Sequence, residues 1–332
     1  MNTEAVIVCG HRPGPRAHIA RRLAVERGCV VSHALRTDAA HDFSSDALHV
    51  VRHGRPERLV AEIPAEASLL ETLGSFLDDD DTTVREVVCV VDAARFFDDL
   101  LDDEYYTVPG TRPRRYVARA LRMVQQIELA SALIVTGWED VPTRDLAVLL
   151  ALLSHLAPAA QIGLTRAERV GPQSRFDDHV HQPGWVHVLN DEHDPFMRDL
   201  RVQTFRYQQL RPFHPDRLHR VLDEQIGSGA FGAVLRSAGM CRIATRPGLS
   251  GSWEHVGQMI SLDPLDPLAL DGHDEEPLAL GQDIAFTGID MDAVALSRAL
   301  DAAALTDEEL LAGPAAWLTY ADPFPSWESA VH

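Results

Sequence analysis

Cysteine is scarce in this 332-residue sequence. The four cysteines, Cys9, Cys29, Cys89 and Cys241, are isolated from one another, and no paired-cysteine metal motif occurs. Three of them fall in apolar, strand-like segments, which is typical of buried free thiols rather than of disulfides. The sequence therefore favours free thiols and excludes a site built on cysteine pairs.

Basic residues and long apolar runs are also few. The chain has 30 Lys and Arg against 50 Asp and Glu, a net charge of −20. Such a surface repels phosphate backbones, so we expect no direct nucleic-acid binding and favour a basic protein partner. No segment reaches the roughly 18 consecutive apolar residues of a spanning helix, and the first residues lack a signal-peptide pattern. We expect a cytoplasmic protein that does not bind membranes.

Familiar catalytic motifs are missing as well. The sequence has no nucleophile elbow, no Rossmann glycine fingerprint and no HExxH. Two acidic groups, Asp78–Asp81 and a cluster between Asp98 and Glu104, are runs of like charge that normally stay in water. We interpret the first as an exposed loop and the second as an exposed helix end.

The residues that are present indicate two domains. The stretch from Pro183 to His219 begins with loop residues, continues into a β-branched and aromatic strand, and then opens a helix at Pro215. We place an N-terminal domain at residues 1–182, a linker at 183–200 and a C-terminal domain at 201–332.

Residues 1–182 alternate between apolar strands and amphipathic helices. Short apolar runs at 5–9, 58–62, 86–92, 133–140 and 160–164 read as buried strands, with helices between several of them at 16–25, 117–129 and 145–156. This order predicts an α/β domain with a doubly wound, mainly parallel sheet.

Residues 201–332 read as β-α-β-β-β-α. We expect strands at 201–207, 233–244, 254–262 and 283–289, and helices at 215–226 and 292–304. This pattern predicts a smaller α+β domain of the ferredoxin-like kind. Its aromatic residues Trp253, Trp317, Phe324 and Trp327 either close the core beneath the C-terminal segment or present a protein-binding face, and the core is favoured.

The C-terminal residues resemble a known family. The ordered segments RPFHP (211–215), VLRSAG (234–239), SWEHVG (252–257), LTDEEL (305–310) and DPFPSW (322–327) are similar to the C-terminal domain of the CobW family. The resemblance implies a P-loop nucleotide-binding N-terminal domain, GTP as cofactor, and a role in zinc or cobalt supply.

The nucleotide motifs of the family are altered here. Its loop GxxxxGK[ST] aligns with residues 10–17, where Gly10 remains but Pro15, Arg16 and Ala17 replace the second glycine, the lysine and the Mg²⁺-binding hydroxyl. Proline removes an N–H, alanine cannot bind a metal, and arginine keeps only the charge. The segment is either a plain β–α turn or a residual phosphate site, and we expect no efficient hydrolysis.

Two further nucleotide positions survive in part. The resemblance assigns Glu62 to the switch region, but Pro64 follows in place of flexible residues. It assigns Asp140 to the base-recognition motif NKxD, with Gly137 and Trp138 replacing Asn and Lys. Gly10, Arg16, Glu62 and Asp140 are therefore our candidates for residual GTP binding; Trp138 either stacks on a base or is a partly buried structural residue.

Zinc is the second cofactor to consider. The family's clustered-cysteine motif is absent, and the corresponding interval has histidines without a close ligand pair, at positions 33, 41, 49 and 53. The better candidate is Asp177, Asp178, His179 and His181: on an extended segment both imidazoles would point the same way and share a Zn²⁺ with an aspartate. The alternative is an acidic, histidine-rich surface linker that binds no ion.

These features predict a CobW-like pseudo-GTPase, a binding protein in zinc homeostasis rather than an enzyme. Residues 305–327 resemble a subgroup that lacks an intact P-loop, the ribosome hibernation factor-recruiting factors, although a cysteine pair of that subgroup is missing here. That resemblance implies a protein partner, either a hibernation factor or the ribosome. The alternative is a zinc metallochaperone with weak GTP binding and hydrolysis, and a third possibility is a structural subunit of a larger assembly.

Overall fold

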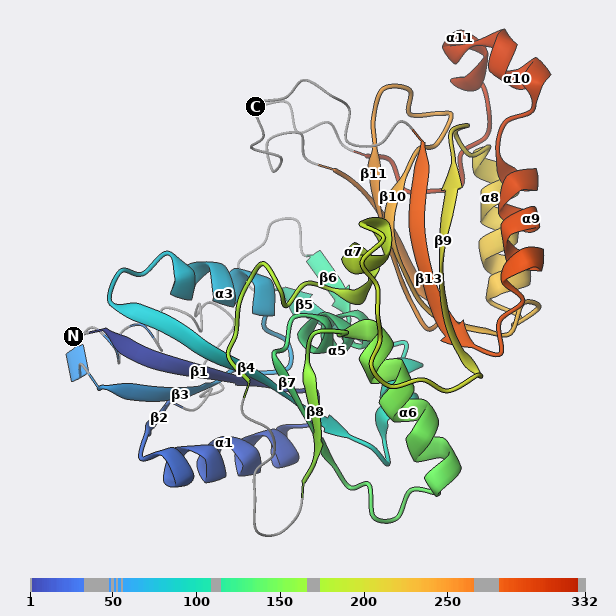
Figure 1. Ribbon diagram of the computed structural model, residues 1–332. Helices are drawn as coiled ribbons and strands as arrows, with labels where there is room; N and C mark the ends of the chain where they lie inside the picture. The colour runs from blue at the N-terminus through green and yellow to red at the C-terminus, as the bar shows by residue number, and fades with distance from the viewer. Residues whose placement is uncertain are drawn as a thin grey trace. The chain divides into compact units, whose positions relative to one another are not determined.

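A computed structural model describes residues 2–32, 48, 51, 53–54, 56–108, 115–165, 174–265 and 281–327. The chain divides into two compact units (Figure 1). The first comprises residues 1–184 and 194–199, and the second comprises residues 185–193 and 200–332. Part of the predicted linker is helical, since α7 spans Gly184–Leu189.

The first unit is built on a six-stranded parallel sheet in the order β2-β3-β1-β4-β7-β8. Its strands are β1 (Thr3–Cys9), β2 (Val30–Ser32), β3 (Arg58–Glu62), β4 (Thr82–Asp92), β7 (Ala132–Thr136) and β8 (Gln161–Leu164). The helices are α1 (Pro13–Arg27), α3 (Leu69–Leu77), α4 (Phe96–Leu100), α5 (Arg119–Glu128) and α6 (Thr143–Leu156). A separate hairpin pairs β5 (Tyr105–Val108) with β6 (Arg115–Ala118).

Both faces of the central strands are buried. One face packs Val6, Val8 and Val60 against Ile19 and Leu23 of α1. The alternate residues, such as Ile7, are buried on the other face. Because a parallel sheet covered on both sides reads as continuous apolar runs, the sequence signal was clear. The predicted α/β class with a doubly wound parallel sheet is confirmed.

Three helices of the first unit differ from the prediction. Helix α1 begins at Pro13 rather than at Arg16, because proline is favoured in the first turn of a helix. Helix α3 was not predicted, although its N-cap Ser68 accepts a hydrogen bond from the Glu71 N–H. Helix α5 begins only after β6, so the first residues of the predicted helix form a strand.

The second unit contains a five-stranded antiparallel sheet in the order β12-β11-β10-β13-β9. The strands are β9 (Val202–Gln209), β10 (Ala233–Cys241), β11 (Gly251–Val256), β12 (Met259–Pro264) and β13 (Gln282–Ile289). The helices are α8 (Pro215–Arg220), the π-helical η1 (Val221–Ile226), α9 (Ala293–Ala303), α10 (Asp307–Ala312) and α11 (Pro314–Trp317). An α+β domain in addition to the α/β domain is as predicted.

One strand prediction in this unit was wrong. The segment 254–262 is not a single strand: it turns at Gly257, whose φ is +59°, and forms the hairpin of β11 and β12. The turn adds a fifth strand, and β12 pairs with β11 over six residue pairs. The glycine inside this strand pattern was the available signal, because glycine readily adopts the left-handed conformation that a tight turn needs.

The aromatic residues divide between core and surface. Trp253 is fully buried, and Phe324 and Trp327 pack against the core cluster of the second unit. Trp317 lies outside that cluster, and its indole N–H donates to the Glu309 carbonyl at 2.7 Å. The predicted core role therefore holds for three of the four residues.

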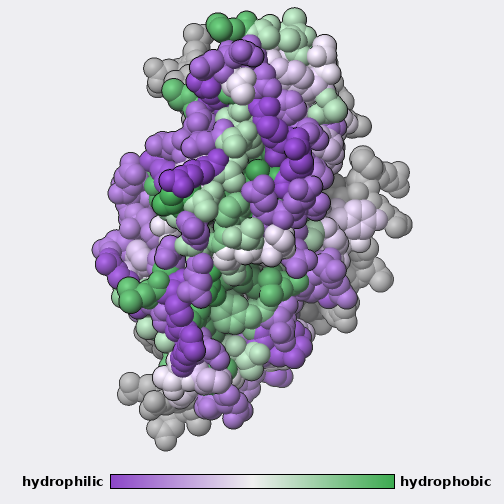
Figure 2. Space-filling view, turned by 90° about the vertical axis from the view of Figure 1, so that its right-hand side faces the viewer, coloured by the Kyte–Doolittle hydropathy of each residue, from purple (hydrophilic) through white to green (hydrophobic). Residues whose placement is uncertain are grey.

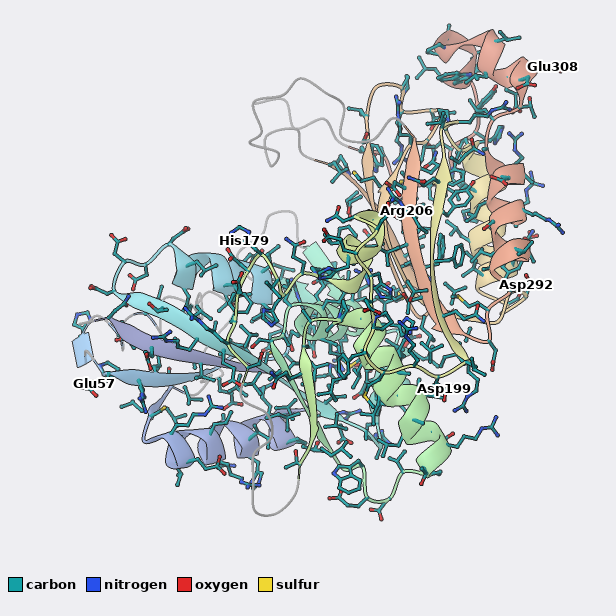
Figure 3. All side chains as sticks on the ribbon, viewed as in Figure 1. Glu57, His179, Asp199, Arg206, Asp292 and Glu308 are labelled. Atoms are coloured by element: carbon teal, nitrogen blue, oxygen red, sulfur yellow. The ribbon has the colours of Figure 1, made fainter. Side chains whose placement is uncertain are left out.

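Among the residues that the structure describes, no helix is long and apolar enough to cross a membrane. Figure 2 shows one face of the molecule, on which hydrophilic residues surround smaller hydrophobic patches. Arg206 on β9 (Figure 3) illustrates the pairing of charged side chains: it donates hydrogen bonds to Asp283 and to Asp191.

Candidate functional site

The candidate site lies where β1 and β4 end. From β1 the chain first builds β2 and β3 on one side of the sheet, and then crosses to β4 on the other side. Ligands of open α/β sheets bind in the crevice at such a reversal of strand order. The residues after β1 are Gly10, His11 and Arg12, and β4 ends at Asp92.

The connection between β1 and α1 is too short to wrap a phosphate. Only Gly10, His11 and Arg12 lie between the two elements, because α1 begins at Pro13. Most of the segment that aligns with the phosphate loop is thus helical. The helix end is also poor in donors, since Pro13 and Pro15 lack an N–H and Arg16 N donates to the Arg12 carbonyl at 3.2 Å.

Gly10 is held by the protein itself. Its N–H donates to the Gln126 side-chain oxygen at 3.0 Å, and its carbonyl accepts from the Arg16 guanidinium at 2.8 Å. Its φ is +145°, and a Cβ there would lie 2.5 Å from the Val90 carbonyl oxygen. Glycine is required here by the close approach of β4, and its peptide groups are already satisfied.

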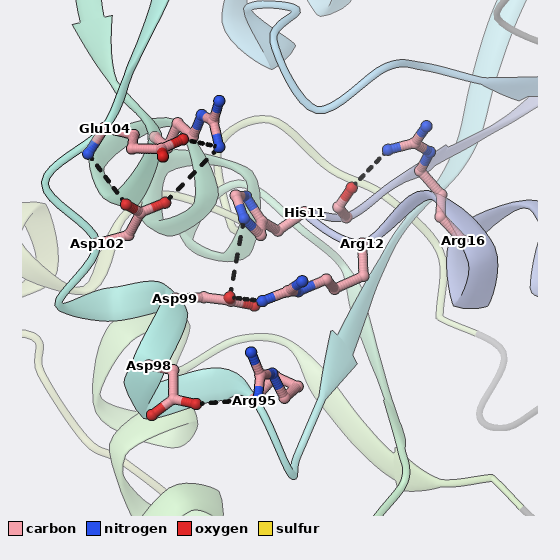
Figure 4. A network of polar contacts seen from close by, with 10 residues as sticks. His11, Arg12, Arg16, Arg95, Asp98, Asp99, Asp102 and Glu104 are labelled. Atoms are coloured by element: carbon pink, nitrogen blue, oxygen red, sulfur yellow. Dashed lines mark hydrogen bonds and ion pairs between the residues drawn. The ribbon is translucent and has the colours of Figure 1, made fainter.

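Arg16 and Glu62 form a buried ion pair. The Arg16 Nε lies 3.0 Å from Glu62 Oε1, and the two side chains are 7% and 6% exposed. Removing one partner of such a pair leaves an uncompensated buried charge, which costs about 3–5 kcal/mol. Two predicted nucleotide-binding residues therefore bind each other, and Arg16 points inward from α1 (Figure 4).

A second charged cluster joins the loop to α4. Arg12 Nε donates to Asp99 at 2.9 Å, a second Arg12 nitrogen also contacts Asp99, and His11 Nε2 lies 3.9 Å from the same carboxylate (Figure 4). Burial lowers the pKa of His11, against the opposing effect of Asp99. Asp99 is 4% exposed, so the expectation that the whole acidic cluster is solvated was wrong for this residue.

The space beside this cluster is small. A cavity of about 10 Å³ lies among residues of the β1–α1 loop, β4, α4 and α5, including His11, Cys89 and Phe96. That volume corresponds to about one water molecule. It is too small for a phosphate group in this conformation.

Asp140 is not buried as Arg16 and Glu62 are. It is exposed in the turn after β7, whereas Arg16 and Glu62 are buried. The neighbouring Trp138 is half-buried, and its indole N–H donates to the Thr165 carbonyl at 2.9 Å. The structure thus brings Gly10, Arg16 and Glu62 together and leaves Asp140 at the surface.

The backbone around His179 and His181 is not extended, although the predicted zinc site assumed that it is. Residues 178–180 form a turn, in which His181 N donates to the Asp177 carbonyl at 2.8 Å. His181 is buried and stacks on Phe176, whereas the His179 side chain is 91% exposed (Figure 3). Asp178 lies 3.9 Å from His179 Nε2. The assumption that both imidazoles point the same way was wrong.

In the part of the chain that the structure describes, no three His, Cys, Asp or Glu side chains are grouped to hold a metal ion. The four cysteines are free, and all but Cys29 are buried. The histidines at positions 33, 41 and 49 lie outside the described residues, and His53 is exposed.

Sequence reasoning missed two contributors to the site. Gln126 is fully buried, and its amide N–H₂ lies 3.3 Å from the Ala65 carbonyl while its oxygen binds Gly10. A glutamine on the buried face of an amphipathic helix was the available signal. Asp99 carried no separate signal, because it belongs to a run of acidic residues and such runs normally stay in water.

Comparison with known proteins identifies part of the second unit. Residues 202–304 match the family model described as the cobalamin synthesis protein cobW C-terminal domain. This segment is a CobW C-terminal domain. It spans β9 to α9, so the RPFHP segment and the pairing of β10 with β13 belong to it.

Beyond the CobW C-terminal domain, the chain is similar to two curated proteins. It is 27% identical over 272 residues to the zinc-regulated GTPase metalloprotein activator 1 of Dictyostelium discoideum, covering 74% of this chain and 57% of that protein. It is 29% identical over 275 residues to a zinc chaperone of Mycobacterium tuberculosis, covering 74% and 63%. The chain thus spans less than two thirds of the length of these relatives.

A solved structure is also similar, the Zn(II)-bound YjiA GTPase from E. coli. The identity is 14% and the TM-score 0.36, with 92% of this chain and 100% of that chain covered. Among the curated relatives, the Dictyostelium protein is named for zinc and for GTP hydrolysis, and the mycobacterial protein is named for zinc.

Proposed function

We propose that this chain is a CobW-like pseudo-GTPase that acts as a binding or recruiting protein in zinc homeostasis or the low-zinc response. The observation that carries the proposal is the closed end of β1: Gly10 is bonded to Gln126 and Arg16, and Arg16 is paired with Glu62. A nucleotide phosphate would have to break these contacts and the first turn of α1. The zinc context comes from the similarity to proteins named for zinc.

The chemistry of the cationic side chains supports the same proposal. All 30 basic residues of the chain are arginines, so no lysine is available to contact a transferred phosphoryl group. The guanidinium of Arg16 is planar and engaged on two sides, by the Gly10 carbonyl and by Glu62. Any nucleotide binding that remains would use Asp140 at the surface and a rearranged Arg16.

A protein partner is part of this proposal. One relative is named a metalloprotein activator, and the net charge of −20 suits a basic partner. A ribosome hibernation factor, or the ribosome, is the partner that the resemblance of residues 305–327 suggests. Affinity purification from zinc-starved and zinc-replete cells should enrich such a partner in the starved cells; an equal yield would contradict a low-zinc role.

The proposal that the chain does not bind nucleotides is tested by calorimetry on the metal-stripped protein with GTP, GDP and ATP in the presence of Mg²⁺. We expect no micromolar binding and no phosphate release. A cooperative thermal unfolding transition in the same sample is the control that the protein is folded. Micromolar GTP binding that Asp140→Ala or Arg16→Gln weakens at least tenfold would sink the pseudo-GTPase proposal.

The similarity to a protein named a zinc chaperone favours one alternative, a zinc metallochaperone with weak GTP binding and hydrolysis. It requires a metal site, for which the sequence candidates are Asp177, Asp178, His179 and His181; the first three are exposed, whereas His181 is buried. A Zn²⁺ titration separates the two proposals, since a chaperone should bind zinc and lose affinity on His179→Ala. His219→Ala, in the second unit, is the matched control.

A further inference from the structure

A second charged cleft lies at the opposite end of the parallel sheet. It has a volume of about 590 Å³ and is lined by residues from the start of β1 and β3, from β4 and from the end of α1. This volume is in the range of small-molecule sites, about 300–1,000 Å³. Four arginines and three glutamates line it, so positive charge prevails locally although the whole chain carries −20.

A β-bulge builds one wall of this cleft. In the pairing of β1 with β4, Val84 lies opposite Ala5 and Glu86 lies opposite Val6, which leaves Arg85 as an extra residue. Successive residues of a regular strand point to opposite faces, and a bulge re-aims a side chain. Here it allows two consecutive residues, Arg85 and Glu86, to line the same cleft.

The negative charges of two of the glutamates are already paired with arginines of the protein. Glu86 is 3% exposed, contacts Arg27, and accepts from the Ser174 N–H at 3.1 Å. Glu4 accepts two hydrogen bonds from Arg85, at 2.6 and 3.0 Å, and lies 3.5 Å from Arg58 Nε. Their charges are therefore largely neutralised before any ligand arrives.

Two arginines keep donors for a ligand. Arg175 is exposed, and within the described part of the chain it forms no hydrogen bond or ion pair. Arg58 is 57% exposed, and its contacts with Glu4 and the Arg27 carbonyl are both long, at 3.5 Å. Two guanidinium groups on one cleft offer the paired N–H donors that bind phosphate in bidentate fashion.

We propose that this cleft binds a small phosphate-bearing anion through Arg58 and Arg175, with Arg85 supporting the wall. The site is distinct from the end of β1 described above, because β1 has seven residues and its two ends are roughly 20 Å apart. The proposal therefore stands whether or not the chain binds GTP. Glu26, whose nearest partner is Arg22 at 3.9 Å, limits the negative charge that the ligand can carry.

A built-in reporter allows the test. Cys29 lines the cleft and is the one cysteine of the four that is not buried. Its alkylation by neutral iodoacetamide, followed by mass spectrometry, should slow at least fivefold as inorganic pyrophosphate saturates the cleft, and should not slow with sodium chloride of equal ionic strength. Arg175→Gln should raise the half-protecting concentration at least fivefold, whereas Arg220→Gln, a surface residue paired with Asp216, should leave it unchanged.

Several results would overturn the proposal. These are the absence of protection, protection by chloride alone, an unchanged response in Arg175→Gln, and equal protection by succinate, which would remove the preference for phosphate. Cys29→Ser should bind pyrophosphate in calorimetry as the wild type does. Loss of binding in that variant would overturn recognition by the arginines.

Discussion

At the scale of single residues, the buried histidine on β11 makes stability depend on pH. His255 is 5% exposed, and burial, followed by the nearby charge of Arg236, lowers its pKa to about 4. Because the folded pKa lies below the ordinary value of about 6.5, the neutral form is favoured by folding. Its contribution is fully present above about pH 6.5 and is lost as the pH falls towards 4.

We therefore expect His255→Gln to flatten the fall in the free energy of unfolding between about pH 6.5 and pH 4, measured by urea denaturation. His179→Gln is the matched control, since that side chain is exposed and should not change the slope. An identical slope in the His255 variant and the wild type would show that folding does not lower the pKa of His255.

At the scale of elements, the segment Asp322–Trp327 closes the edge of the second unit's sheet. The Trp327 N–H donates to the Leu262 carbonyl of β12 at 2.7 Å, and the Arg246 guanidinium lies 4.3 Å from the indole. Gly251 is required beneath the ring, because a Cβ there would lie 2.5 Å from Trp327 Cη2. The packing of the Trp327 ring on Gly251 ties the C-terminal segment to β11.

Gly251→Ala should therefore lower the free energy of unfolding by about 1–3 kcal/mol, the usual cost of overpacking. In a Trp327→Ala background the same change should cost much less, because the clashing ring is gone. A double-mutant cycle from urea denaturation measures the coupling. Equal costs in the two backgrounds would show that the indole does not pack on Gly251.

At the scale of the whole molecule, the net charge of −20 works against folding. Like charges repel over longer distances than ion pairs act, so salt should screen repulsion more than attraction. We expect Tm to rise by a few degrees when sodium chloride increases from about 20 to about 200 mM, where the Debye length falls below about 10 Å.

The triple variant Asp78→Asn, Asp80→Asn and Asp81→Asn provides the comparison, since all three residues are exposed. It removes three negative charges, so Tm should rise less with salt than in the wild type. If salt lowers Tm in both proteins, the arginine–carboxylate pairs outweigh the net repulsion.

Local patterns alone specified much of the fold. The apolar run of β4 predicted a buried parallel strand because a sheet covered on both faces has no polar alternation. The ordered motifs of residues 211–327 are short stretches of sequence, so they indicated the CobW C-terminal domain without any knowledge of long-range contacts. The turn at Gly257 and the helix start at Pro13 were predictable in principle from the properties of glycine and proline.

The tertiary structure decided the polar partners. Arg16 and Glu62 are 46 residues apart, and only the parallel pairing of β1 with β3 brings the end of one strand beside the other. The same holds for Gln126 with Gly10, at a separation of 116 residues. His179 and His181 show the converse, because a turn replaced the assumed extended segment. Sequence determined which residues are buried in each element; which charges meet depended on long-range pairing of strands that no local pattern encodes.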